Sequence, residues 1–432
     1  MKTPLFACVV MLGCAAAGCG RTTATSLSPG LEGEARLGVA DANNATPVLA
    51  SWGRFVVAVW TAEKGGATDV YAATSDDNGV TFRTSVRVND VAGEAHVYGE
   101  DPPRVALAAA APAPEILVTW PSQRQKHLGL RSARSLDGGR TFSASVSTGD
   151  VAIEGERGFQ AVTFGSDHVA RAVWLDQRRD PGTPPHANAG GDWDPMHLMF
   201  ASGVADGRWE PEIRLASNVC GCCKTAIATG PDGSVYVAWR NIYPGNLRDI
   251  SFAVSRDGRA FSAPVRVSED HWALDGCPDD GPTMAVDATG TIHLVWPTLV
   301  DGPDPAVRLF YTSSRDGVTF TPRHAIETLG TPKPAHPQLT LDECGTLALV
   351  WDEAHGTNRR VAMRRLFPLA SGGVRADALK IINGDGAGTY PVITAVQGGV
   401  LVAWTEGAEH TTVGVRRIGL DSTCSLTHTS AR

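Results

Sequence analysis

A short apolar strand that ends in tryptophan recurs along the whole chain, and this repeat constrains the fold more than any other feature. The first copy is "VVAVW" at 56–60 and the last is "VLVAW" at 400–404, with 53 to 65 residues between successive tryptophans. An apolar strand repeated at this period predicts a circular array with one four-stranded sheet per copy. The seven copies end at Trp60, Trp120, Trp174, Trp239, Trp296, Trp351 and Trp404.

A second repeat lies in the turn after the third predicted strand of several copies. "SDDNGVTF" (75–82) and "SLDGGRTF" (135–142) share the pattern Ser-x-Asp-x-Gly-x-Thr-aromatic, and "SRDGRAF" (255–261) and "SRDGVTF" (314–320) are one residue shorter. An aspartate here can accept backbone N–H groups within the turn, while glycine takes the positive φ. We expect structural roles for Asp77, Asp137, Asp257 and Asp316.

These two repeats together resemble the Asp-box, or bacterial neuraminidase repeat, propellers of the sialidase superfamily. The resemblance covers nearly all of the chain after the N-terminal segment, and it implies an all-β propeller with its Asp-boxes on the face opposite the active site. We expect seven four-stranded blades, with six, the number typical of sialidases, as the alternative. Residues 35–40 should complete the last blade, so that no sheet edge is exposed. The predicted propeller domain is 34–424, followed by a tail over 425–432.

The N-terminal segment has the features of a secretory signal. A lysine at position 2 precedes an apolar run, and "AAGC" at 16–19 resembles a bacterial lipobox that lacks the usual leucine. We predict a signal over 1–19 with lipidation at Cys19, an ordinary cleaved signal being the alternative, and a flexible tether over 20–33. The chain is then an exported lipoprotein of a bacterial cell envelope, anchored to the membrane.

Charge and composition narrow the class of partner. The net charge is −8 without a basic stripe, which argues against a nucleic acid. Glycine is abundant, at 47 residues, and this favours strands and turns over long helices. We expect a monomer that binds a glycan, a metal ion or a small molecule.

Three cysteines fall within four positions in "SNVCGCCKTA" (217–226), and a fourth lies in "EDHWALDGCPDDGPT" (269–283). In a propeller, the loops that lead into the innermost strands open on one face, so these two leading loops should be neighbours there. Six cysteines beyond the signal favour disulfides in an exported protein, including a pair between Cys344 and Cys424. The alternatives are a redox-active thiol beside Lys224 and a copper or zinc site. The metal ligands would be Cys220, Cys222, Cys223, Cys277 and His271.

The succession "CGCC", "RDI" and "GCP" also resembles a subgroup of Asp-box proteins labelled sialidase-like by their fold, in which lipoproteins occur. Sialidases clamp a substrate carboxylate with three arginines and use a tyrosine–glutamate pair and an aspartate for the chemistry. The usual Arg-Ile-Pro segment is missing, because the matching place reads "NATPVLAS". The remaining candidates are Arg104, Arg240 and Arg248, with Tyr390 or Tyr243 near Glu406.

Polar and titratable residues converge on the predicted loop face, including a long loop over 175–197. Because concave polar sites favour such places, we predict first a pocket rich in Cys, His and Arg that binds a metal or glycan. The second hypothesis is a sialidase-like glycoside hydrolase with non-standard catalytic residues. The third is an envelope interaction module with structural disulfides only.

Overall fold

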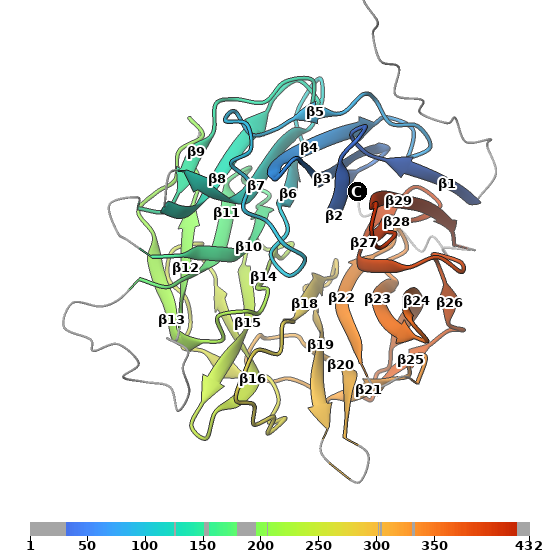
Figure 1. The fold of residues 1–432 in the computed structure, drawn as a ribbon. Coiled ribbons are helices and arrows are strands. Elements are labelled where there is room, and N and C mark those ends of the chain that lie inside the picture. The colour runs from blue at the N-terminus through green and yellow to red at the C-terminus, as the bar shows by residue number, and fades with distance from the viewer. Residues whose placement is uncertain are drawn as a thin grey trace, which may run out of the picture.

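The computed structural model of the chain describes residues 32–124, 127–150, 155–178, 196–204, 206–300, 302, 305–330 and 333–420. The regular elements in these residues are β-strands, and their sheets form a ring (Figure 1). Within the same residues, no helix has the length and apolar character that crossing a bilayer requires. The predicted signal, Cys19, the tail and Cys424 lie outside the described residues.

Each tryptophan repeat forms one antiparallel four-stranded unit, here called a blade. The first blade has β2 (Asn43–Trp52), β3 (Phe55–Lys64), β4 (Ala67–Ser75) and β5 (Val86–Arg87), and the second has β6 (Arg104–Ala108), β7 (Glu115–Arg124), β8 (His127–Ser135) and β9 (Val146–Thr148). The third has β10 (Arg157–Phe164), β11 (Ala170–Asp176), β12 (Met196–Ser202) and β13 (Ile213–Val219), and the fourth has β14 (Ala226–Thr229), β15 (Val235–Tyr243), β16 (Leu247–Ser255) and β17 (Val265–Arg266).

The remaining blades follow the same order. The fifth has β18 (Thr283–Val286), β19 (Ile292–Val300), β20 (Ala306–Ser314) and β21 (His324–Ile326). The sixth has β22 (Pro334–Leu341), β23 (Leu347–His355), β24 (Asn358–Pro368) and β25 (Val374–Ala376), and the short β26 (Lys380–Ile381) also pairs with β24. The last has β27 (Gly388–Val396), β28 (Gly399–Glu406), β29 (Thr412–Gly419) and β1 (Glu32–Leu37).

The third and fourth blades form one eight-stranded sheet, but β13 and β15 meet only at Val219 and Asn241. Counted as two blades, they bring the described strands to seven units, six of four strands and one of five. β1 pairs with β29, with Ala35 opposite Val415, so that N-terminal and C-terminal strands share one blade and close the ring (Figure 1). The closing strand begins at Glu32, inside the segment predicted as tether, and ends before residues 38–40.

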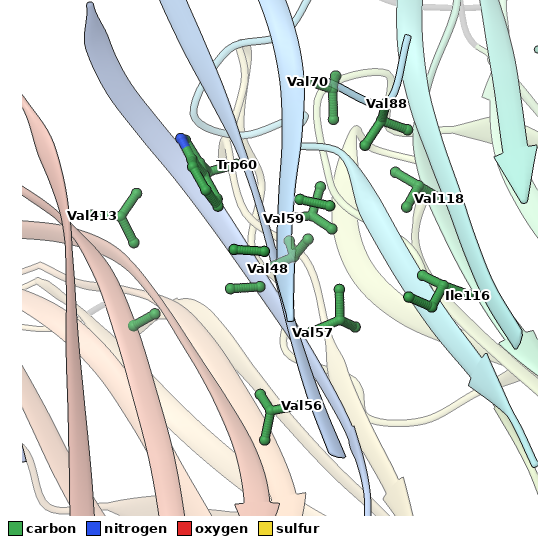
Figure 2. Close-up of a cluster of buried hydrophobic side chains, with 14 of the residues drawn as sticks. Val48, Val56, Val57, Val59, Trp60, Val70, Val88, Ile116, Val118 and Val413 are labelled. Atoms are coloured by element: carbon green, nitrogen blue, oxygen red, sulfur yellow. The ribbon is translucent and has the colours of Figure 1, made fainter. Parts of the chain in front are cut away.

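The core lies between the faces of neighbouring blades. All seven tryptophans of the repeat are at most 1% exposed. Figure 2 shows one such layer, in which Val48, Val59 and Trp60 of the first blade lie between Val413 of the last blade and Val118 of the second. Because each apolar strand packs on two neighbours, the repeat stabilises the ring only when it is complete.

The Asp-box turns join the third and fourth strands of their blades and make the predicted contacts. In one of them, Oδ1 of Asp257 accepts the backbone N–H groups of Arg259 and Ala260, both at 2.9 Å. The backbone N–H groups of Ala260 and Arg259 lower the pKa of Asp257 to about 2, so this carboxylate stays charged and holds the turn. Corresponding turn contacts are made by Asp77, Asp137 and Asp316.

Candidate active site

The innermost strands of four blades carry a β-bulge with a non-glycine residue in the left-handed region. These residues are Thr46, Phe159, His336 and Tyr390, with φ between 52° and 54°. Left-handed backbone is unfavourable for such side chains, and bulges of this kind are common beside active sites, where they re-aim a side chain.

Side chains from neighbouring segments hold these bulges in place. The backbone N–H of Phe159 donates to Asp101 at 2.7 Å, that of His336 to Asp280 at 2.5 Å and that of Tyr390 to Asp352 at 2.8 Å. These three carboxylates are at most 5% exposed. Burial raises the pKa of Asp101 to about 7.

Six blades contribute to a small well at the axis of the ring, where innermost strands meet. Its lining includes Thr46, Arg104, Lys224, Asp280, His336 and Tyr390. Within it, the hydroxyl of Tyr390 donates to Oε1 of Glu100 at 2.8 Å. The ring of His336 lies against that of Tyr390, with 4.3 Å between the centroids. Burial raises the pKa of Tyr390 and the charge of Glu100 adds to the shift, so the hydroxyl is protonated and its proton faces a carboxylate.

His336 and Asp352 form an ion pair beside this hydroxyl, with 2.7 Å between Nδ1 and Oδ2. Burial by itself lowers the pKa of His336, but the Asp352 carboxylate outweighs it, and the pKa lies above 6.5. Burial likewise opposes the charge on Asp352, but His336 and Arg359 bring its pKa below 3.8. Both partners are therefore charged at mildly acidic pH.

We predict that His336→Asn lowers the free energy of unfolding more at pH 5.5 than at pH 8.5. The pKa of His336 is higher in the folded protein than the 6.5 of a free histidine, so its protonation stabilises the fold. This stabilisation is complete below pH 6.5 and is lost as the pH rises through the pKa that His336 has in the folded protein. The pKa of Asp352 is lower in the folded protein than its ordinary 3.8, so its ionised form also stabilises the fold. This second stabilisation is present above pH 3.8 and is lost as the pH falls through the pKa that Asp352 has in the folded protein. Urea unfolding at both pH values measures the difference.

His293 is the matched control for this prediction. It is also buried, but burial lowers its pKa, so the stability linked to its neutral form decreases toward acidic pH. His293→Asn should therefore show the opposite pH trend. An equal effect of His336→Asn at both pH values would contradict the ion pair.

A larger cleft of about 450 Å³ opens beside the well, between the leading loops of the second to fifth blades. Cleft and well share Glu100 and Asp279, so they form one continuous site. Apolar walls alternate with acids along the cleft, which is lined among others by Tyr98, Leu128, Glu156, Phe159, Ile242 and Cys220. A cavity of this size and character accommodates a small organic ligand or part of a glycan.

The cysteines of the two leading loops meet in the wall of this cleft. Cys222 and Cys277 form a disulfide, which places the fourth and fifth blades' leading loops side by side as predicted. Cys220 and Cys223 are free thiols, both buried, with 3.4 Å between their sulfurs. Cys344 is also disulfide-bonded, and Cys424, its predicted partner, lies outside the described residues.

This arrangement does not present the predicted four-thiolate metal cage. Cys222 and Cys277 are consumed by their mutual disulfide, although Cys220, Cys222 and Cys223 lie close enough to share an ion and Cys222, Cys277 and Asp279 form a second such group. His271 belongs to neither group, because its ring is exposed and faces Glu269 at 3.7 Å. Only two of the four predicted thiolate ligands, Cys220 and Cys223, are free thiols in this oxidised state.

The candidate arginines do not assemble a carboxylate clamp. Arg240 is fully buried and donates to three backbone carbonyls, those of Asp280, Arg248 and Pro297. Arg248 lines the cleft but donates to the carbonyl of Leu274. Arg104 lies in the well, where its Nε donates to the carbonyl of Gln160 at 2.8 Å. Each of the three guanidinium groups thus donates to backbone carbonyls, and the fully buried Arg240 is not available to a substrate carboxylate.

The tyrosine–glutamate pair differs from the one expected. Glu406 bonds Arg36 at 2.5 Å, and Tyr243 bonds Ser251 at 2.7 Å, so neither meets Tyr390. Glu100 takes that place. A sequence signal does exist, because His336 and Tyr390 each directly precede the proline of an innermost strand. Most of the long loop over 175–197 lies outside the described residues.

Asp279 was not singled out from the sequence, yet it lines both cleft and well. Its backbone is left-handed, with φ of 56°. Burial and the charge of Glu100 raise its pKa. Asp279 is thus a carboxyl group that takes up a proton more readily than an ordinary aspartate, beside the Glu100 of the tyrosine–glutamate pair.

The chain was compared with known proteins at the levels of family, sequence and structure. No family model matches it, and no curated protein matches its sequence. Similar solved structures include an ulvan lyase of polysaccharide lyase type PL25, with a TM-score of 0.57, 9% identity, and coverage of 88% of this chain and 94% of that one. The lectin BP39L from Burkholderia pseudomallei has a TM-score of 0.57 and 12% identity, over 88% of this chain and 98% of the lectin. The polysaccharide lyase Uly1 has a TM-score of 0.53 and 12% identity, over 89% of this chain and 92% of the lyase.

The chain has the fold of a β-propeller. Its all-β sheets of four strands confirm the predicted fold class. At these identities the likeness shows the fold alone, so the propeller's chemistry has to be argued from its own residues.

Proposed function

We propose that this propeller is a retaining glycoside hydrolase that acts on non-acidic glycans in the cleft. Tyr390 is the nucleophile, Glu100 the base that takes its proton, and Asp279 the acid that protonates the leaving oxygen. The observation that carries the proposal is the 2.8 Å hydrogen bond from Tyr390 to Glu100 at the junction of well and cleft. A neutral tyrosine is a weak nucleophile, and an adjacent carboxylate activates it as the proton transfers.

The reaction has two balanced steps. Tyr390 Oη bonds to the anomeric carbon and passes its proton to Glu100, while the glycosidic C–O bond breaks and the leaving oxygen takes the proton of Asp279. Water then attacks the same carbon, gives a proton to Asp279 and displaces Tyr390, which recovers its proton from Glu100. The raised pKa of Asp279 suits this alternation between acid and base.

The charge of the site supports a non-acidic substrate. Glu100, Asp101, Glu156 and Asp279 line the cleft. Arg157, the second cleft arginine beside Arg248, bonds the buried Asp176 at 2.9 Å. The cations of the well, Arg104 and Lys224, donate to the backbone carbonyls of Gln160 and Pro337. An anionic sugar such as a sialoside or uronate would therefore meet the acids of the cleft without a clamp for its carboxylate, which disfavours both sialidase and lyase chemistry. Two lyases of polysaccharides and a lectin among the similar structures support a carbohydrate ligand.

We further propose that the protein reaches the cell envelope through its N-terminal signal and stays membrane-anchored through lipidated Cys19. The motif "AAGC" and the polar segment after it support this. Metabolic labelling with a fatty-acid probe, compared between the natural chain and Cys19→Ser, tests the anchor.

The hydrolase is tested with a panel of neutral aryl glycosides and oligosaccharides, with product release as the readout. On the best substrate, Glu100→Gln should lower kcat/KM by about 10²- to 10⁴-fold, because the amide cannot take the proton of Tyr390. Glu406→Gln is the matched control and should stay within about twofold, since Glu406 bonds Arg36 instead. Binding of glycans without turnover, or equal losses in both variants, would contradict hydrolysis at this pair.

A further inference from the structure

Two thiols and one disulfide lie together in the leading loops of the fourth and fifth blades, and the glycan chemistry above uses none of them. The sulfur of Cys220 lies 3.8 Å from that of Cys222, which is bonded to Cys277, and 3.4 Å from that of Cys223. The sulfur of Cys223 lies 4.0 Å from that of Cys222. Each free thiol thus stands next to a disulfide sulfur.

The surroundings of the two thiols differ in a way that separates their roles. The hydrogen bond from Cys223 lowers the pKa of Cys220 against the effect of burial, and Arg248 and Arg240 lower it further. Nη1 of Arg248 is 3.7 Å from the Cys220 sulfur. Burial raises the pKa of Cys223, and its bond to Cys220 adds to the shift. Cys220, which accepts the hydrogen bond and lies beside the guanidinium, is therefore the thiol of the pair that ionises more readily.

The same charges weigh against a metal ion at this pair. A guanidinium beside Cys220 already neutralises a thiolate, and it repels a cation that would bind there. A thiolate stabilised by arginine and facing a disulfide sulfur is instead the arrangement of an attacking nucleophile.

We propose that Cys220, Cys222, Cys223 and Cys277 form an internal dithiol–disulfide exchange site. The thiolate of Cys220 attacks the sulfur of Cys222, the bond from Cys222 to Cys277 breaks, and Cys277 leaves as a thiolate that takes a proton from water. Cys223 then loses its proton to water and attacks Cys220, which releases Cys222 as a thiolate. The net change oxidises Cys220 and Cys223 by two electrons and reduces Cys222 and Cys277 by two, so no outside oxidant is required.

The exchange changes the wall of the cleft. In the structure, the disulfide ties one blade's leading loop to the next, and Cys222 and Cys277 line the cleft. After exchange the crosslink lies within one loop, and Cys222 and Cys277, the more exposed two of the four cysteines, become thiols. They can then react with small electrophiles or small-molecule disulfides that enter from solvent, which the buried Cys220 and Cys223 meet far less readily.

The intact folded chain tests the proposal without reductant, with N-ethylmaleimide as the probe. Trypsin places the three clustered cysteines on peptide 215–224 and Cys277 on 267–308, so the disulfide in the structure links two peptides and the exchanged one lies within a single peptide. We expect Cys277 to accumulate maleimide while 215–224 gains an internal disulfide. The rate should rise at least about tenfold from pH 6 to pH 8, as the thiolate fraction grows.

Two matched variants assign the attacking sulfur. Cys220→Ser should keep the two peptides linked, whereas Cys223→Ser should still release Cys277 and leave a bond between Cys220 and Cys222. Exchange is ruled out if natural protein keeps Cys277 bridged after a day at pH 8, and the assignment fails if Cys220→Ser releases Cys277 as fast. If Cys220→Ser does not fold, the pH series and Cys223→Ser decide alone. The experiment measures which cysteines are bonded or labelled and involves no sugar, so its result is independent of whether the chain hydrolyses glycans.

Discussion

Tyr390→Phe should lower kcat/KM on the best glycan substrate by about 10³-fold or more, because it removes the attacking oxygen of the proposed reaction. The lost atom is the hydroxyl that donates to Glu100 at 2.8 Å. The phenyl ring can keep its contact with His336, so the bulge and the fold should survive. Circular dichroism and the urea midpoint of the variant verify that the loss is chemical.

The control for this change is Tyr243→Phe. That hydroxyl bonds Ser251 at 2.7 Å, and Tyr243 does not line the cleft, so activity should stay within about twofold. An activated 2-fluoro glycoside of the substrate gives a second readout, since it should leave a sugar covalently bound to Tyr390. Unchanged turnover in Tyr390→Phe, or label on another residue, would assign the nucleophile elsewhere.

The fold could be predicted from the sequence because its causes are local and repeated. One strand pattern ending in a buried tryptophan occurs seven times, and each copy carries the same requirement for burial between two neighbours. Closure of the ring could be predicted because the open edge of the last sheet needs a strand to pair with, and β1 does pair with β29. The Asp-box contacts were equally local, since Asp257 accepts N–H groups from residues two and three positions later.

The site could be predicted only as far as its face. The sequence placed Cys222 and Cys277 in neighbouring loops, and they bond each other. Which side chains meet at the axis depends on bulges and loop paths that no local pattern specifies. Tyr390 was expected near Glu406, 16 residues away, but it bonds Glu100, which is 290 residues distant and lies across the closure of the ring. For the same reason His271 was expected inward and lies exposed.

Asp352→Ala should lower the free energy of unfolding by about 3–5 kcal/mol. The reason is that, among the described contacts, this one carboxylate is shared by His336, Arg359 and Tyr390. This carboxylate is 0% exposed and bonds the Nδ1 of His336, the Nε of Arg359 and the backbone N–H of Tyr390. Its loss leaves two half-buried cations, His336 and Arg359, without this carboxylate, and Tyr390, a left-handed residue, without an acceptor for its N–H.

Asp385→Ala is the control for Asp352→Ala, because it removes an ordinary surface ion pair instead of the carboxylate that His336, Arg359 and Tyr390 share. Asp385 pairs with Arg360 at 3.3 Å but is fully exposed, so its removal should leave the midpoint of urea unfolding nearly unchanged. Asp352→Asn keeps an oxygen acceptor for Tyr390 and should be less destabilised than Asp352→Ala. A loss below about 1 kcal/mol in Asp352→Ala would mean that the well is held by its strands rather than by this carboxylate.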